Sequence, residues 1–207
     1  MKNIAVIVFI LWSSMLGAQN VSNHSGAFQC HQAKINRFKS GKSYSAPLPK
    51  IANALKYNIH TNLYHCFLPP YPNNFDAHLE ATFLTLIPTD SLQLNAENTS
   101  LVIESVGLDA SSFTHFGNIL TLHLNQVFQP GDTIHLAIDY EHLNVTDHAF
   151  YASNGHVFTD CEPEGARKWF PCYDSPDDKA LFELTAGTTA NVKLGSNGIL
   201  ADSAMVG

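Results

Sequence analysis

The sequence is poor in basic residues. Lys and Arg number 11 among 207 residues against 18 Asp and Glu, which gives a formal net charge of −7. Because phosphate binding relies on clustered Lys and Arg, this balance argues against a nucleic-acid partner. Charged residues of either sign make up only 14% of the chain and hydrophobic residues 45%. This composition is typical of a globular domain with a real core and unlike that of a disordered chain.

Long apolar runs and the usual metal motifs are also missing. No run reaches the roughly 20 apolar residues of a membrane-spanning helix, so we expect no transmembrane span. The four cysteines form no CxxC pair and the 11 histidines form no HExxH motif, which argues against a structural zinc knuckle and a catalytic zinc helix. His123 and His135 stand at polar positions of alternating segments, so we expect them to face solvent.

The first 18 residues have the three parts of a secretory signal. Lys2 precedes the apolar run Ile4–Trp12, and small residues follow as far as Ala18. We therefore expect cleavage after Ala18 and a secreted, periplasmic or cell-envelope location. Disulfides are possible in such a compartment, and three pairings remain open for the four cysteines, which are Cys30, Cys66, Cys161 and Cys172.

The rest of the chain divides at about residue 50. Residues 19–50 are polar and turn-rich, and we expect a lead-in with one short helix over Phe28–Phe38. Residues 51–207 alternate apolar and polar positions between short turns, which predicts an all-β, antiparallel β-sandwich. The predicted strands lie at Tyr57–Thr61, Leu79–Phe83, Leu92–Leu94, Leu101–Ile103, Ile119–Leu124 and Ile134–Tyr140, and the rhythm resumes over Leu181–Leu194. The last residues show neither a cap nor a closing strand, so we expect a truncation before a further domain.

One stretch breaks this pattern: EPEGARKWFPCYDSPDDKALF, from Glu162 to Phe182. Pro163 suits the first turn of a helix, so we predict a short helix over residues 163–169 with Glu162 at its cap. After this helix, Asp174 is placed to bond backbone amides or to pair with Arg167. From these residues alone, the stretch is a capped helical connection between two sheets.

The same stretch resembles a known family. The residues concerned are Glu162, Ala166, Arg167, Pro171, Cys172, Asp174, Pro176, Lys179, Ala180 and Phe182. Their spacing is similar to that of a segment in the amino-terminal domain of the aminopeptidase N family of zinc metallopeptidases. The resemblance implies a saddle-shaped β-sandwich that packs on its own C-terminal catalytic domain. Arg167, Pro171, Asp174 and Pro176 would form the structural part of the motif.

The resemblance also implies a function, the removal of N-terminal residues from peptides. Glu162 would bind the α-ammonium group at the substrate N-terminus, and Asp160, where the family usually has Gln, would line the pocket for the first side chain. The family's zinc site and G-x-M-E-N loop do not occur in these residues. We therefore expect zinc in the absent catalytic domain, with no metal site and no catalytic residue in this segment.

Two alternatives of another class remain open. The first is a stand-alone secreted β-sandwich that binds a glycan or a protein. Its contact residues would be the loop aromatics Tyr64, Phe67, Tyr71 and Phe75. The second is a non-catalytic peptidase homologue that has kept the sandwich and lost the zinc site.

Overall fold

The computed structural model describes residues 2–8, 47–193, 195 and 198–206. The predicted helix over Phe28–Phe38 and the lead-in as far as residue 46 lie outside this range. The elements are almost all strands, with two short 3₁₀ helices. In chain order they are β1 Lys2–Val8, β2 Ala52–Asn62, η1 Tyr64–Phe67, β3 Phe75–Thr85, β4 Thr89–Asn95, β5 Leu101–Leu108, β6 Ala110–Phe116, β7 Ile119–Phe128, β8 Thr133–His142, β9 Phe150–Ser153, β10 His156–Thr159, η2 Ala166–Lys168, β11 Leu181–Thr188 and β12 Ile199–Val206.

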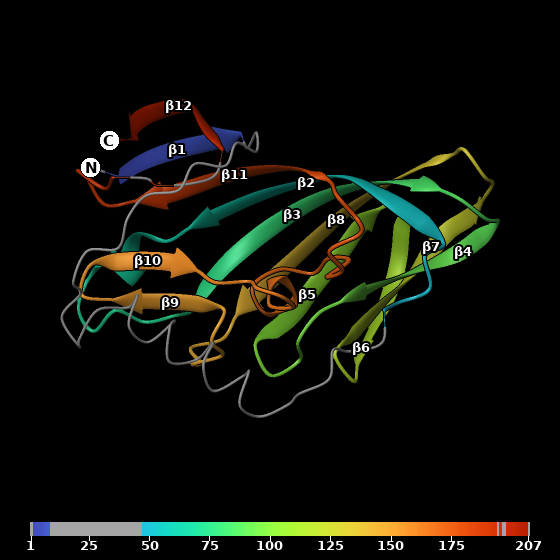
Figure 1. Ribbon diagram of the computed structural model, residues 1–207, viewed down its shortest axis with the longest axis horizontal. Helices are drawn as coiled ribbons and strands as arrows, with labels where there is room; N and C mark the ends of the chain where they lie inside the picture. Colours follow the sequence, from blue (N-terminus) through green and yellow to red (C-terminus); the bar gives the residue numbers. More distant parts are fainter. Residues whose placement is uncertain (1, 9–46, 194, 196–197, 207) are drawn as a thin grey trace.

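The strands form three sheets (Figure 1). The largest has the order β12-β1-β11-β2-β3-β8-β5, the second the order β4-β7-β6, and β9 pairs with β10 in the third. The all-β sandwich is therefore confirmed, with one correction to its antiparallel character. Strand β11 runs parallel to β2. A parallel neighbour needs a long crossover rather than a hairpin, and here that connection is the whole chain from the end of β2 to the start of β11, residues 63–180.

Alternation along the strands builds one core between the large and the three-stranded sheet. In β3 every second residue from Phe75 to Thr85 is buried, including Phe75, Leu79 and Phe83, while the alternate positions face outward. Burying one such side chain contributes about 1.5–3 kcal/mol. The other fully buried large side chains are Ile59, Leu92, Leu94, Leu101, Leu120, Leu122, Ile134, Leu136 and Tyr140.

Each predicted strand lies within or overlaps an observed one, and His123 and His135 are exposed as expected. The rhythm expected over Leu181–Leu194 ends earlier, because β11 stops at Thr188. Strands β1, β6, β9, β10 and β12 were not predicted, and β12 (Ile199–Val206) corrects the expectation that the last residues form no strand. Phe75, expected as a loop aromatic of the alternative binding module, is instead a core residue at 1% exposure.

The predicted leader overlaps the first strand. Lys2–Val8 forms β1, which lies between β11 and β12 and runs antiparallel to both. Cleavage after Ala18 would remove this strand from the sheet, and such cleavage stays a prediction. Within the described part of the chain, no helix has the length and apolar character needed to cross a membrane.

Candidate functional site

The motif segment connects β10 to β11 and crosses the middle of the molecule, in orange in Figure 1. Its helix is shorter than predicted, because η2 covers only Ala166–Lys168 and begins after Gly165. Glu162 and Pro163, which are joined by a cis peptide bond, lie in the preceding turn, and no side chain caps the helix. A Cβ atom on Gly165 would lie 2.9 Å from the Cα atom of Cys161. This tight turn, which needs a glycine, takes the place of the first predicted helical residues.

An ion pair between Arg167 and Asp174 closes the segment into a loop. The Nε atom of Arg167 donates to Oδ2 of Asp174 at 2.7 Å, and the backbone N–H of Arg167 donates to the same oxygen at 3.3 Å. A third bond runs from Nη2 of Arg167 to the Asp174 carbonyl oxygen at 3.2 Å. The side chains are only 11% and 7% exposed. Asp174 thus pairs with the side chain of Arg167 and also accepts a backbone amide, the two contacts that the sequence suggested.

Backbone hydrogen bonds fasten this loop to the end of β4. Asn95 and Cys172 exchange two bonds, at 2.8 and 3.0 Å, as an isolated antiparallel bridge. The amide of Glu97 donates to the Arg167 carbonyl oxygen at 2.8 Å. The side-chain oxygen of Asn95 also accepts the amide of Asp174 at 3.1 Å. The loop therefore has a fixed position on the three-stranded sheet.

Aromatic side chains fix the other side of the loop to the large sheet. Trp169 and Phe170 are both buried and each makes an edge or tilted contact with Phe182 of β11. The ring of Phe170 also lies 5.5 Å from that of Tyr57. The hydroxyl of Tyr57 accepts the amide of Tyr173 at 3.0 Å. The aromatic residues of the motif thus belong to the core that joins the two sheets.

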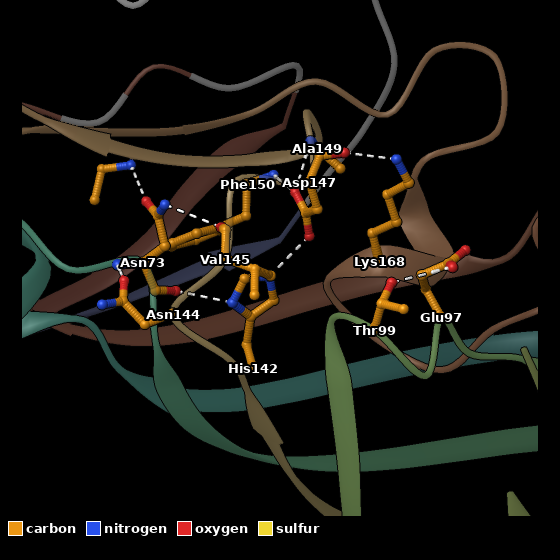
Figure 2. A network of polar contacts seen from close by, with 11 residues as sticks. Asn73, Glu97, Thr99, His142, Asn144, Val145, Asp147, Ala149, Phe150 and Lys168 are labelled. Carbon is orange, nitrogen blue, oxygen red and sulfur yellow. Dashed lines mark hydrogen bonds and ion pairs between the residues drawn. The ribbon is translucent and has the colours of Figure 1, made fainter.

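A second polar network braces the segment from the β8–β9 loop (Figure 2). Nε2 of His142 lies 3.0 Å from Oδ2 of Asp147, and Nδ1 lies 2.8 Å from the carbonyl oxygen of Asn73. His142 is fully buried and its ring stacks on Phe75. Nζ of Lys168, at the end of η2, donates to the Asp147 carbonyl oxygen. The network therefore ties η2 to the end of β8.

Asp147 is held as a carboxylate in this network. Burial acts to raise its pKa, but the hydrogen bonds from His142 and from the amides of Ala149 and Phe150 outweigh burial, so the pKa of Asp147 is lowered. The two amides donate to Oδ1 at 2.9 and 3.1 Å. Both ring nitrogens of His142 face acceptors, the carbonyl oxygen of Asn73 and the carboxylate of Asp147.

The two residues expected to contact substrate flank Cys161 at the start of the segment. Glu162 is exposed and Asp160 is half-buried, and the amide of Asp160 donates to the Ala149 carbonyl oxygen at 2.8 Å. Of the structural motif residues, Pro171 is buried and Pro176 exposed. The turn that carries Glu162 is thus anchored before it by the bond between Asp160 and Ala149 and after it by the Arg167–Asp174 pair, while Glu162 itself is exposed.

A hollow of about 370 Å³ lies beside this turn. Pro163, Glu164 and Pro176 line it together with the Arg167–Asp174 pair. Oε2 of Glu164 lies 3.7 Å from Nη2 of Arg167, so this second glutamate is directed toward the ion pair. Neither Glu162 nor Asp160 lines the hollow. Among the residues that the structure describes, no group of three or more His, Cys, Asp or Glu is arranged to hold a metal ion.

The cysteines of the described chain carry free thiols. Cys66, Cys161 and Cys172 are not joined in a disulfide, and Cys30 lies outside the described residues. Burial raises the pKa of Cys66 to about 11 and that of Cys161 to about 12. For Cys172, burial likewise raises the pKa well above its usual value. The three thiols are therefore protonated at neutral pH.

We expect these thiols to react slowly in the native chain, because the thiolate is the nucleophile. In a Cys30→Ser variant at pH 8, iodoacetamide should modify them at least ~100-fold more slowly in the native state than in guanidinium chloride. Mass spectrometry of timed samples measures the rates. Equal rates with and without denaturant would contradict the buried positions.

Sequence reasoning missed the His142–Asp147 network and the role of Asn73. The side-chain oxygen of Asn73 accepts a hydrogen bond from the amide of Ala152 at 2.8 Å, and the backbone amide of Asn73 donates to the side-chain oxygen of Asn144, in the β8–β9 loop, at 2.9 Å. The sequence held only one local signal for this network. Asp147 stands two and three residues before Ala149 and Phe150, whose amides its side chain accepts, as in an Asx turn. The long-range partners carry no sequence pattern.

Comparison with known proteins identifies the class. Residues 56–206 match the family description "Peptidase M1 N-terminal domain". Puromycin-sensitive aminopeptidase of Caenorhabditis elegans is 33% identical over 162 residues, which cover 67% of this chain and 16% of the relative. Probable aminopeptidase 1 of Sulfurisphaera tokodaii is 45% identical over 47 residues, or 23% of this chain and 6% of the relative.

Solved structures share the fold. A mutant M1 zinc metallopeptidase from Deinococcus radiodurans, bound to a Tyr-Ser-Ala substrate, superposes with a TM-score of 0.61 at 17% identity. A two-domain M1 zinc metallopeptidase mutant bound to L-tryptophan gives 0.60 at 15% identity. Each match covers 70% of this chain and 34% of the solved chain. This chain therefore spans about a third of these structures and 16% of the first relative.

The fold and the braced segment thus define a β-sandwich domain of the metallopeptidase class. The chain belongs to the M1 family of zinc metallopeptidases and corresponds to the family's N-terminal domain.

Proposed function

We propose that this domain covers the active-site cleft of a secreted zinc aminopeptidase and supplies Glu162 to bind the substrate's free α-ammonium group. The zinc ion and the residues that activate water would belong to the catalytic domain. Asp160 would line the pocket for the first substrate side chain. The observation that carries the proposal is the exposed Glu162 on a turn whose following residues are fixed by the Arg167–Asp174 pair.

The chemistry of an exopeptidase explains why such a fixed carboxylate is useful. A free N-terminus carries a positive charge and an internal amide does not, so a carboxylate facing it discriminates between the two. That discrimination requires a carboxylate held in one place, because positional freedom weakens charge-assisted bonds. The loop provides this rigidity through its bridge to Asn95 and its buried aromatics.

Replacing Glu162 with Gln in the complete enzyme should lower kcat/KM for amino-acid amides at least tenfold, which corresponds to about 1.4 kcal/mol. The loss should appear mainly in KM, because the lost contact is to the bound amine. Steady-state kinetics with a fluorogenic aminoacyl amide measures both constants.

Glu164→Gln is the matched control, since Glu164 is an acid of the same turn that faces Arg167. This variant should keep KM within about twofold of the unchanged enzyme, the range of a partly exposed pair. Unchanged kinetics in Glu162→Gln, or an equal loss in both variants, would remove the role assigned to Glu162.

A further inference from the structure

A second hollow, of about 660 Å³, lies on the outer face of the large sheet. His60 of β2 and His78 of β3 lie directly opposite each other in the antiparallel register and both line it. Their neighbours Ile59 and Leu79 point to the core, so the two imidazoles point outward. The ring centroids are 6.5 Å apart, with the planes inclined by 42°.

A carboxylate on the next strand fixes the ring of His78. Nδ1 of His78 lies 2.6 Å from Oδ1 of Asp139, and the hydroxyl of Ser105 donates to Oδ2 at 2.6 Å. A carboxylate accepts hydrogen bonds, so Nδ1 of His78 is the donor to Asp139, and Nε2 is the ring nitrogen that remains available to a ligand. Metal-binding histidines commonly have this arrangement of a carboxylate behind the ring.

The charge around the two rings favours a cation. The carboxylates of Asp76, Glu104 and Asp139 line the same hollow. None of the residues that line it, all within the described chain, is Lys or Arg. Imidazole nitrogen suits zinc, copper and nickel, whereas calcium and magnesium prefer all-oxygen sites.

The spacing of the two rings is compatible with a shared ion. Two imidazole nitrogens at about 2.0–2.1 Å from a tetrahedral zinc ion lie about 3.3 Å apart. Rings directly opposite on antiparallel strands have Cβ atoms about 4.5–5.5 Å apart. His60 is exposed, so its ring can turn about χ1 and χ2 to bring Nε2 toward that of His78.

We propose that His60 and His78 form a two-histidine site for a divalent transition-metal ion, Cu²⁺ or Zn²⁺, with Asp139 as the residue that positions His78. Since no described group of three or more ligands exists, the remaining coordination positions are open to water or to a donor atom of a bound molecule. The site is separate from the motif segment and independent of the function proposed for Glu162. It also departs from our sequence-based expectation of no metal site in this segment.

Isothermal titration of the purified 207-residue chain with Cu²⁺, and separately with Zn²⁺, tests the site. We expect one equivalent of Cu²⁺ to bind more tightly than Zn²⁺, following the Irving–Williams order. His60→Ala and His78→Ala should each weaken Cu²⁺ binding at least ~10-fold, because each leaves a single imidazole. Asp139→Asn should weaken it ~10-fold while both ligands remain.

His123→Ala and His135→Ala are the matched controls, because both residues are exposed strand histidines away from the hollow. Their Cu²⁺ affinity should equal that of the unchanged chain. Circular dichroism and the melting temperature without metal check that all variants are folded. Binding that survives in the folded double variant His60→Ala/His78→Ala, or that falls equally in the control variants, would overturn the proposal.

Discussion

Replacing Asp174 with Asn is expected to lower the free energy of unfolding by about 3–5 kcal/mol, the cost of removing one partner of a buried ion pair. The carboxylate is 7% exposed and is the acceptor for both the guanidinium and the amide of Arg167. In the variant, an uncharged amide would face a buried cation. Urea unfolding of the purified chain, followed by tryptophan fluorescence, measures the difference, since Trp169 lies in the same segment.

A double-mutant cycle separates the pair from the rest of the loop. Arg167→Met should destabilise the chain by a similar amount, because it leaves Asp174 buried and uncompensated. Arg167→Met/Asp174→Leu should be more stable than the sum of the single effects predicts, by about 1–3 kcal/mol. Strictly additive effects, or a loss below about 1 kcal/mol in Asp174→Asn, would show that the pair does not hold the loop.

Replacing Asp147 with Asn is expected to cost about 3 kcal/mol at pH 7, because it removes the charge that faces the fully buried His142. The loss should depend on pH in a definite direction. The folded pKa of Asp147 is lowered, so its contribution is present above the unfolded value of about 3.9 and disappears as pH falls through the folded pKa. The stability gap between the unchanged chain and the variant should therefore shrink below about pH 4.

The matched control is Asp139→Asn, which changes an aspartate paired with a histidine at the surface. His78 and Asp139 are 40% and 48% exposed, and their atoms are 2.6 Å apart. Solvent screening limits such a pair to at most about 1 kcal/mol. Urea unfolding at several pH values compares the two variants. If Asp147→Asn cost no more than Asp139→Asn, or if its effect did not change toward low pH, the buried network would not carry this stability.

Local pattern was enough to predict the strands that build the core. Alternation in Leu79–Phe83 and Ile134–Tyr140 reports which side chains face inward, since a strand turns successive residues to opposite faces. The same reasoning predicted the helix near Glu162 but began it too early, since η2 covers only Ala166–Lys168. There, a close approach between Gly165 and Cys161 replaces the helical turn expected from Pro163, and no local propensity encodes that approach.

The contact between Arg167 and Asp174 was open to prediction because the two residues are seven apart on either side of a turn. The braces from Asn95, Tyr57 and Asp147 were not, because their partners in the segment are distant in the chain. The parallel placement of β11 beside β2 was likewise not predictable from the sequence. It depends on where a long crossover delivers the strand and not on the strand's own residues.

The sequence alone determined an acidic, all-β domain with the motif of the M1 family, because composition, alternation and fixed gaps between motif residues are properties of the chain itself. Tertiary structure alone decided which distant groups meet: His142 with Asn73 in the interior, and His60 with His78 on the outer face. The physical reason is register. Which residue stands opposite which is set by strand pairing across the whole sheet, and a shift by one position would turn every side chain to the other face.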